Sequence, residues 1–390
     1  MTQKQDIHGN PADQPGQVKG SILRLEFGEN RAFELDIRQR VDAYFQQRTG
    51  QSKTGSWQMY LKTVVVLAFF AIFYVLLAFV ANSVWQGLSL AILLGLSTAG
   101  IGFNIAHDGG HKAYSKAVWV NKLMAATMDL VGVSSYAWFW KHAVIHHRYV
   151  NITGYDTDID IGIIGRLSPH SKRLPIHRWQ HFYLWPLYGL LASKMQFVDD
   201  FKRIIRGRIG KHGFPRPTGW ELVIFVAGKM VFFTWAFCIP LLFHTFWVVL
   251  FYYGVAVLVL GLTIAVVFQL PHCVEQAAFP IPREGRMENP WAVHQASVTL
   301  DFARGDRIVS WPLGGLNYHL EHHLFPTICH IHYPALTKIV EQTCRDHGVT
   351  YAEHRSFWTG LAAHYRWLRQ MGAPVEQAVK ASQRPLRVKD

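Results

Sequence analysis

The chain has 390 residues, half of them hydrophobic, a mean hydropathy of +0.09 and a formal net charge of +13 at pH 7. It is too apolar for an ordinary soluble domain of this charge and too polar for a bundle of many spans. A few membrane helices joined to a large polar portion fit this balance. The basic residues lie between apolar stretches, so anionic lipid head groups and phosphate-bearing substrates, not nucleic acid, are the expected partners.

The chain begins with a polar stretch, residues 1–33, that has no apolar core of the signal-peptide kind, and we expect disorder there. An amphipathic helix is predicted from Glu34 to about Gln51. The last residues, 373–390, are expected to be loose. The four cysteines form no CxxC pair and are interpreted as reduced thiols on the cytosolic side or in the membrane. They are Cys238, Cys273, Cys329 and Cys344.

Four stretches are long and apolar enough to cross a bilayer. They cover residues 61–81, 84–106, 221–243 and 245–270. About 20 residues at a rise of about 1.5 Å span about 30 Å, the thickness of one bilayer core. Because only short breaks separate the members of each pair, the spans form two hairpins. Lys229, in the third span, is expected to extend its ammonium group to the interface.

The remaining sequence predicts a cap on one side of the membrane. Residues 182–192 form a shorter apolar stretch that contains Pro186, which favours an interfacial helix over a span. The connections within the hairpins carry no Lys or Arg, so the basic side is cytosolic. We therefore predict an all-α membrane protein with four spans, both termini in the cytosol, and a helical cytosolic cap of residues 107–220 and 271–372.

Histidines gather in three groups at helical spacing. Residues at positions i, i+3 and i+4 share one face of a helix, so the rings of a group point into the same small volume. Neutral imidazole is a strong ligand for iron, zinc and copper. With 21 histidines in the chain one pair would be weak support, but three groups indicate a metal centre. The groups are His107 and His111; His142, His146 and His147; and His319, His322 and His323.

Eight imidazoles exceed the four to six ligands, roughly, that one ion takes, so two ions are predicted. The sequence has no HExxH pattern, which argues against a membrane zinc protease. Imidazole sites with open positions suit iron that binds dioxygen. Substrates confined to a membrane are apolar, and oxygen-activating iron attacks their C–H bonds.

The three groups and their flanks resemble the histidine boxes of membrane fatty acid desaturases, most closely the front-end or linoleoyl-CoA-type branch. The boxes read His107-Asp-Gly-Gly-His111, Trp140-Lys-His142-Ala-Val-Ile-His146-His147 with Asn151 behind it, and the segment from Gly314 to Pro326. The match in order and spacing covers roughly residues 60 to 345. It implies a membrane desaturase domain over residues 34–372 and a non-haem di-iron centre. It also implies a reaction in which O₂ and two electrons introduce a double bond into an acyl chain.

The resemblance also implies a ligand just after the last span, where His272 stands. Two positions depart from the branch. His319 replaces the usual Gln at the start of the third box, and Ala143 replaces a common Asn, which weakens any inference on the position of the double bond. The His-Pro-Gly-Gly motif of a fused cytochrome b5 domain is absent. Electrons are therefore expected from a separate donor, a ferredoxin or cytochrome b5 with its reductase.

Several other residues are weaker candidates. His294 is a possible further ligand, and Asp156, Asp158 and Asp160 are possible acceptors for ligand imidazoles. Lysines and arginines between Arg166 and Arg216 are candidate docking residues for an acidic electron carrier. Aromatic residues that could line an acyl channel, although packing is their default role, are Trp138, Trp140, Trp311 and Tyr318. Histidines expected only to pack or to face solvent are His170, His177, His181, His212, His330 and His332.

Other functions fit parts of this pattern. A hydroxylase, ketolase or acetylenase would use the same iron scaffold, and the histidine spacing is common to all of them. A divalent-metal transporter would place its ligands near the bilayer midplane, whereas these lie at the ends of spans and in the cap. A membrane zinc hydrolase would need fewer histidines. The spacing leaves the acyl carrier, whether coenzyme A, a lipid or a carrier protein, open.

Overall fold

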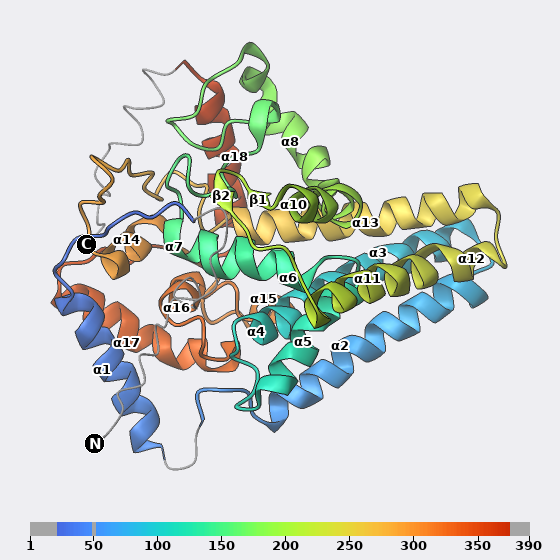
Figure 1. Ribbon diagram of the computed structural model, residues 1–390, viewed down its shortest axis with the longest axis horizontal. Coiled ribbons are helices and arrows are strands. Elements are labelled where there is room, and N and C mark those ends of the chain that lie inside the picture. The colour runs from blue at the N-terminus through green and yellow to red at the C-terminus, as the bar shows by residue number, and fades with distance from the viewer. Residues whose placement is uncertain (1–21, 49–51, 375–390) are drawn as a thin grey trace.

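The computed structural model describes residues 22–48 and 52–374 (Figure 1). This part of the chain is mostly helical, as predicted. Its strands are short: β1 (Arg208–Ile209) pairs antiparallel with β2 (His212–Gly213), and β3 (Asp301–Phe302) pairs parallel with β4 (Glu353–His354).

Four helices are long and apolar enough to cross a membrane, and Figure 1 shows them extending side by side away from the rest of the molecule. Several contain a π-helical turn, in which backbone hydrogen bonds join residues i and i+5. The first is α2 (Trp57–Val75) with its extension to Val80, and the second is α3 (Val84–Ile101), continued by a π-helical turn into α4 (His107–Gly110). The third joins α11 (Trp220–Phe233) to α12 (Ile239–Leu241), and the fourth is α13 (Phe246–Gln269).

The flanks of these helices carry large apolar side chains that nothing else in the described chain covers. Val64 is 64% exposed, Trp85 79% and Trp247 74%. Such faces are stable only against an apolar surrounding, because exposed apolar area in water costs about 25 cal/mol per Å². The prediction of four spans in two hairpins is confirmed.

The side chain of Lys229, on α11, does not lie where we predicted. Its side chain is only 7% exposed and does not extend to an interface. Its ammonium group donates to the carbonyls of Gly132 at 2.6 Å and Gln196 at 2.9 Å, and to the carboxylate of Asp200 at 2.9 Å. Segments from the cap therefore descend alongside the span and supply the acceptors that we expected water or lipid to supply.

The cap is built from short helices around the ends of the spans. In chain order they are α1 (Ala32–Gln47), α5 (Val118–Leu130), α6 (Ser135–Trp138), α7 (His147–Tyr149), α8 (Gln180–Gly189), α9 (Leu191–Lys194), α10 (Asp200–Arg206), α14 (Trp291–Val298), α15 (Arg307–Ser310), α16 (His319–Leu324), α17 (Tyr333–Asp346) and α18 (Phe357–Gly372). One apolar cluster joins α1, α14, α16 and α17, and another joins α8 to α18. Figure 1 shows both at the end of the molecule away from the hairpin turns.

The N-terminal segment is ordered closer to the start of the chain than we expected. Residues 1–21 lie outside the described residues, but residues 22–33 lie against the cap. Leu25 is 1% exposed, and the backbone of Glu26 pairs with that of Arg286. Helix α1 then packs its buried Ile37 and Val41 on α17 and α14.

The shorter apolar stretch around Pro186 forms α8, which does not cross the membrane and packs with α9 along the span α13. The helices α8 and α13 approach each other closely at two glycines. A Cβ atom on Gly261 would lie 2.2 Å from the carbonyl oxygen of Gly189, so no larger residue fits at Gly261.

Candidate metal centre

The first box ends the second span. A π-helical turn from Gly102 to Ala106 leads directly into α4, where the amide of His111 bonds to the carbonyl of His107 at 3.0 Å. Both rings therefore leave the helix on one side. Gly110 makes room for the next element, because a Cβ atom there would lie 2.3 Å from the ring of Trp138.

The second box lies in a π-helix, not in the α-helix that its spacing suggests. The π-helix covers Phe139–His146, and the amide of His147 bonds to the carbonyl of His142. This i to i+5 pattern brings His147 over His142, whereas an α-helix would turn the two rings apart. Their Nε2 atoms lie 3.2 Å apart.

The third box is the single-turn helix α16, which Gly314 positions. Gly314 has a φ of +59°, and a Cβ atom there would lie 2.3 Å from the carbonyl oxygen of Phe103. A residue with a side chain would be strained by the backbone angle and blocked by the contact. The glycine thus allows the third box to lie against the second span, just before the first box.

The structure brings all nine predicted ligand histidines together in the interior, each at most 7% exposed. Ligand atoms of His107, His111, His142 and His322 lie within 4.8 Å of one another and could hold a metal ion. A second group of the same kind consists of His146, His272 and His323. A third, of His147, His322 and His323, shares members with both.

His319 and His294 have different surroundings. The Nε2 atom of His319 lies 3.0 Å from that of His272, at the edge of the second group, although His319 is in none of the three groups. His294, the weaker candidate, is buried but directs its Nε2 at the carbonyl oxygen of Val150, 3.0 Å away. Among the described residues it joins no group of ligand atoms.

Hydrogen-bond acceptors behind the rings fix which nitrogen is free. The Nδ1 atoms of His272 and His319 lie 3.1 and 2.9 Å from the carbonyl oxygens of Val298 and Leu316. A carbonyl oxygen only accepts, so in the neutral ring Nδ1 carries the hydrogen and the lone pair stays on Nε2. Such partners orient metal-binding histidines in proteins generally.

The carboxylate of Asp156 orients the ring of His146 in the same way. Its carboxylate accepts from Nδ1 of His146 at 3.2 Å and from the amide of Asn151 at 2.9 Å. Burial raises the pKa of Asp156, but the adjacent His146 ring and these hydrogen bonds lower it below its ordinary value. Asp158 also lies 3.4 Å from His146, whereas Asp160 is exposed and only accepts from the backbone of Gly162.

The rings are buried and several ligand atoms have no other partner, so this donor set fits a metal. Burial, and then the neighbouring rings, lower the pKa of most of these imidazoles well below 6.5; that of His272 falls to about 3. Among these nine rings, four have a buried Nε2 atom with no hydrogen-bond partner in the described structure: those of His111, His146, His322 and His323. Leaving so many buried polar atoms unpaired is costly unless a ligand satisfies them.

Two features of the third box were not apparent from the sequence. Gln295, on α14, places its side-chain oxygen 3.0 Å from Nδ1 of His323. Glu321 points away from the rings toward Tyr351, whose hydroxyl donates to Glu321 at 3.2 Å and to Asp301 at 2.5 Å. Burial and the neighbouring Asp301 raise the pKa of Glu321 well above its ordinary value. These partners come from distant parts of the chain, so no local spacing reveals them.

His330, which we expected only to pack, belongs to a buried network behind the first box. Its Nδ1 lies 2.8 Å from the carboxylate of Asp108, which also accepts from the thiol of Cys329 at 3.0 Å. Lys62 of the first span lies 3.0 Å from the other ring nitrogen of His330. His330 and Cys329 supply donors to this buried carboxylate, and Lys62, through His330, connects the first span to the first box.

Comparison with known proteins agrees with this arrangement. Residues 83–355 match the family model described as fatty acid desaturase. The chain is 35% identical over 358 residues to an sn-1 linoleoyl-lipid 6-desaturase of Arthrospira platensis, covering 91% of this chain and 96% of that protein. It is 36% identical over 366 residues to an acyl-lipid (8-3)-desaturase of Physcomitrium patens, covering 93% and 76%.

The chain belongs to the fatty acid desaturase family. The resemblance seen in its three histidine boxes is thus confirmed, and so is the likeness to the front-end or linoleoyl-type branch, because these relatives are a linoleoyl-lipid 6-desaturase and an (8-3)-desaturase.

A cavity of about 1220 Å³ connects the histidines of this desaturase to its surface. His107, His142, His146 and His272 line one part of it, and apolar side chains such as Phe268 line much of the rest. Of the four aromatic residues predicted for an acyl channel, Trp138 lines the cavity and stacks on His142 with ring centroids 4.7 Å apart. Trp140, Trp311 and Tyr318 do not line it.

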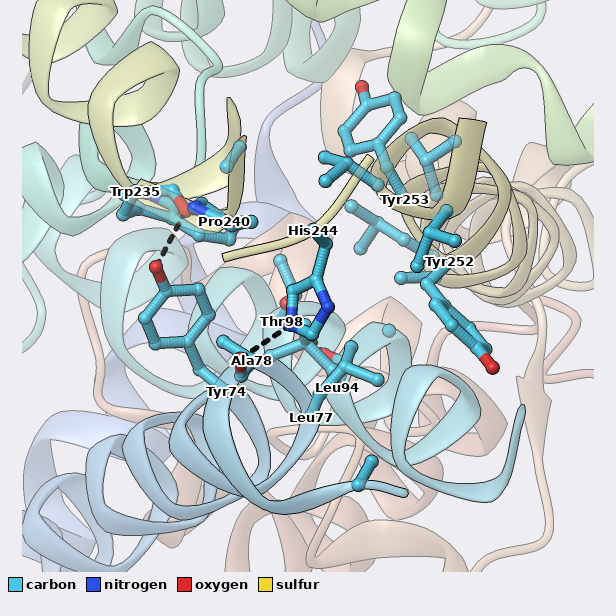
Figure 2. Close-up of a pocket in the computed structure, with 18 of the residues that line it drawn as sticks. Tyr74, Leu77, Ala78, Leu94, Thr98, Trp235, Pro240, His244, Tyr252 and Tyr253 are labelled. Atoms are coloured by element: carbon cyan, nitrogen blue, oxygen red, sulfur yellow. Dashed lines mark hydrogen bonds between the residues drawn. The ribbon is translucent and has the colours of Figure 1, made fainter. Parts of the chain in front are cut away.

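A second cavity, of about 290 Å³, lies among the spans of the desaturase near the hairpin turns (Figure 2). Thr98 and Leu260 line both cavities, so the two adjoin at these residues. Its polar groups are already bonded: the hydroxyl of Tyr74 donates to Trp235, and His244 lies 2.8 Å from the carbonyl oxygen of Ala78. The remaining surface suits an apolar ligand.

One predicted docking residue is not at the surface. Arg166 is fully buried. Its guanidinium donates to the carbonyls of Ser171 and Met371, 2.8 and 3.0 Å away, and to that of Pro169. It holds the loop after the second box against the end of α18 and cannot contact an electron carrier.

Proposed function

We propose that this desaturase introduces a cis double bond into the acyl chain of a membrane lipid or thioester, using O₂, two external electrons and two iron ions. Support comes from the convergence of nine buried histidines, eight of them in groups that could hold a metal ion, beside a large, mostly apolar cavity. We further propose that residues 34–372 act as one catalytic unit.

The residues divide into two ligand sets. His107, His111, His142 and His322 would hold one ion, and His146, His272, His323 and His319 the other. His147 lies where the sets meet. Imidazole ligands suit iron, which when bound would supply the oxygen chemistry that removes two hydrogens from the chain.

The protein's own contribution is to position the chain and to keep water away. A buried, mostly apolar cavity holds a flexible chain in few conformations, so one pair of carbons faces the histidines in each binding event. The overall change takes R–CH₂–CH₂–R′, O₂, two electrons and two protons to R–CH=CH–R′ and two waters. Exclusion of bulk water from the cavity limits side reactions.

The electrons come from a separate donor in this proposal. The desaturation balance requires two electrons per double bond, and the sequence has no His-Pro-Gly-Gly motif of a fused haem domain. A small acidic carrier, a ferredoxin or cytochrome b5, complements a chain of net charge +13. We also propose that the cap faces the cytosol, because the hairpin turns carry no Lys or Arg.

The decisive experiment expresses the chain in a host that lacks polyunsaturated lipids, with fatty-acid analysis of total lipid and metal analysis of the purified protein. A new double bond and about two irons per chain are expected. A hydroxylated product would instead indicate a hydroxylase on the same scaffold, and a single zinc would rule out the di-iron assignment.

A further inference from the structure

The cavity that contains the histidines also has a cationic wall. Six basic side chains line it: Lys141, Lys194, Lys202, Arg203, Arg206 and Arg208. Four acidic residues line it as well, and three of these already hold other groups. Asp156 is bonded to His146, Asp158 to Lys141 and His146, and Asp199 to Lys194 and Arg203.

Three of the six cations have no acidic partner. Lys202, Arg206 and Arg208 are exposed, and no ion pair is formed by any of them within the described chain. The remaining acid, Asp160, is a single exposed carboxylate on the same wall. This part of the cavity therefore has an excess of positive charge.

The three unpaired cations lie on adjacent elements. Lys202 and Arg206 are four residues apart on α10, so they share one face of the helix. Arg208 follows at the start of β1, after the left-handed turn at Gly207.

The surroundings place the part of the cavity lined by Lys202, Arg206 and Arg208 at the level of lipid head groups. The helices α8 and α9, which precede α10, pack on α13 where Gly189 meets Gly261, eight residues or about 12 Å before that span ends. Val198, between α9 and α10, is 51% exposed, and Ile205, on α10 itself, is 70% exposed. Apolar side chains interleaved with cations are typical of a bilayer interface.

We infer that Lys202, Arg206 and Arg208 bind a phosphate group on the carrier of the acyl substrate, while the chain extends inward to the histidines. Arginine binds phosphate oxygens through paired N–H groups, and a lysine adds a point charge. This inference rests on the proposed function and specifies its substrate. A phospholipid head group and the phosphates of coenzyme A share this chemistry, and an uncharged glycolipid lacks it.

The same surface could instead receive an acidic electron carrier, as the sequence suggested. The structure favours the substrate, because these side chains line the cavity that reaches the histidines and lie among exposed apolar residues. A carrier-docking face would need neither feature. Carrier docking is therefore an outcome that the test must distinguish.

The test compares the purified full-length desaturase with the triple variant Lys202→Glu, Arg206→Glu, Arg208→Glu. Linoleoyl chains are offered on phosphatidylglycerol, on coenzyme A and on an uncharged galactolipid, with saturating reductase and carrier. We expect the wild type to favour one phosphate-bearing substrate by at least about tenfold in kcat/KM. The triple variant should lose that preference through KM, with turnover of the galactolipid within twofold of wild type.

Two controls make the comparison specific. Conservative exchanges (Lys202→Arg, Arg206→Lys, Arg208→Lys) should retain the preference. Charge reversal at three other exposed cap cations (Arg283, Lys338 and Arg355) should leave it unchanged. A preference for coenzyme A or for phosphatidylglycerol identifies the source of the phosphate, and both support the inference.

Native mass spectrometry of lipids retained by the purified proteins gives a readout without turnover. Wild type should retain phosphatidylglycerol over galactolipid, and the triple variant should not. Equal kcat/KM on all three substrates together with equal retention of the two lipids, or a rise in the KM for the electron carrier alone, would overturn the inference. Absence of any desaturated product from wild type, with selective lipid retention intact, would contradict the proposed function and not the phosphate site.

Discussion

His319 differs from the other eight histidines of the centre in its contacts. Its Nδ1 is bonded to Leu316 within the same turn, and its Nε2 faces only His272, at 3.0 Å. His322, in contrast, belongs to two of the three ligand groups. The two positions therefore contribute unequally to the proposed iron site.

Substitution by Gln should reveal this inequality. We expect His319→Gln to retain iron and measurable desaturation, because an amide oxygen can replace one peripheral ligand. His322→Gln should lose both, since two ligand groups lose a shared member. Iron content and product from matched membrane preparations decide the point, and equal tolerance at both positions would show that the ligand sets are misassigned.

A second comparison separates ligands from buried histidines in general. His323→Ala should lose product by at least about a hundredfold, the upper end of what outer-shell losses cause, while protein level in the membrane stays normal. His294→Gln is the matched control, because His294 is equally buried but bonds to a backbone carbonyl. Near-normal turnover by His323→Ala would exclude the three-box centre.

Local spacing was sufficient to predict that the rings within each box lie together, since helical neighbours share a face whatever the rest of the fold does. Local spacing was insufficient to predict the polar side chains that contact the third box. Gln295 and Asp301 reach the third box from segments about 20 to 30 residues away, and only the packed cap brings them there. Their residue types are common in loops and helices alike, so nothing in the sequence marks them.

Among the elements, the second box shows most clearly how a correct motif can have an unexpected backbone. We interpreted its histidines as neighbours on an α-helix, but the π-helix of Phe139–His146 is what aligns His142 with His147. A π-helical segment is rare and is found mostly at functional sites. Its cause lies in the packing of rings from several elements around one centre, which propensity alone does not encode.

Helix α5 carries a buried acid, Asp129, that should make stability depend on pH. Burial raises its pKa to about 7 and one carboxylate oxygen has no partner in the described structure. The native state thus holds a proton that the unfolded chain releases near pH 4, so stability should fall as the pH rises from about 4 to about 7. In detergent, Asp129→Asn should flatten this slope, whereas the exposed Glu288→Gln should not. Identical slopes for Asp129→Asn and wild type would refute the assignment.

The contact between α3 and α13 should limit the length of the acyl chain. Thr98 and Leu260 separate the two cavities, and a large ring at position 98 would fill the passage. We expect Thr98→Phe to reduce desaturation of long chains by about tenfold or more relative to short ones. Leu96→Phe, on the exposed face of the same helix, is the control. An unchanged chain-length profile would mean that the tail does not enter the second cavity.

At the scale of the whole molecule, the charge of +13 bears on electron supply. Purified protein with O₂ and substrate alone should give no sustained turnover, and a reductase with an acidic carrier should restore it. Electrostatic steering fades as salt screens it, with a Debye length of about 8 Å at 0.15 M. The rate at limiting carrier should therefore fall with ionic strength, and the rate at saturating carrier much less. If salt had no effect on the rate at limiting carrier, the excess of basic residues would be explained by membrane topology and lipid head groups and not by docking of the carrier.

The architecture was predictable in outline because bilayer thickness fixes the length of a span. The four spans appear where the apolar stretches lie, and the mostly helical cap follows from the sequence between them. The intrusion of the cap between the spans was not predictable. Lys229 illustrates this, because its acceptors lie on segments some 30 to 100 residues away in the chain.

The hairpin turns are also short. Residues 81–83 and 242–245 are the only described segments between the members of each pair of spans, and their large exposed side chains are those of Leu242 and Phe243. Within the described chain, the compartment opposite the cap therefore meets only these two turns. A protease, antibody or signalling molecule there would have little described surface to bind, so we expect partners that control this desaturase to bind on the cap side.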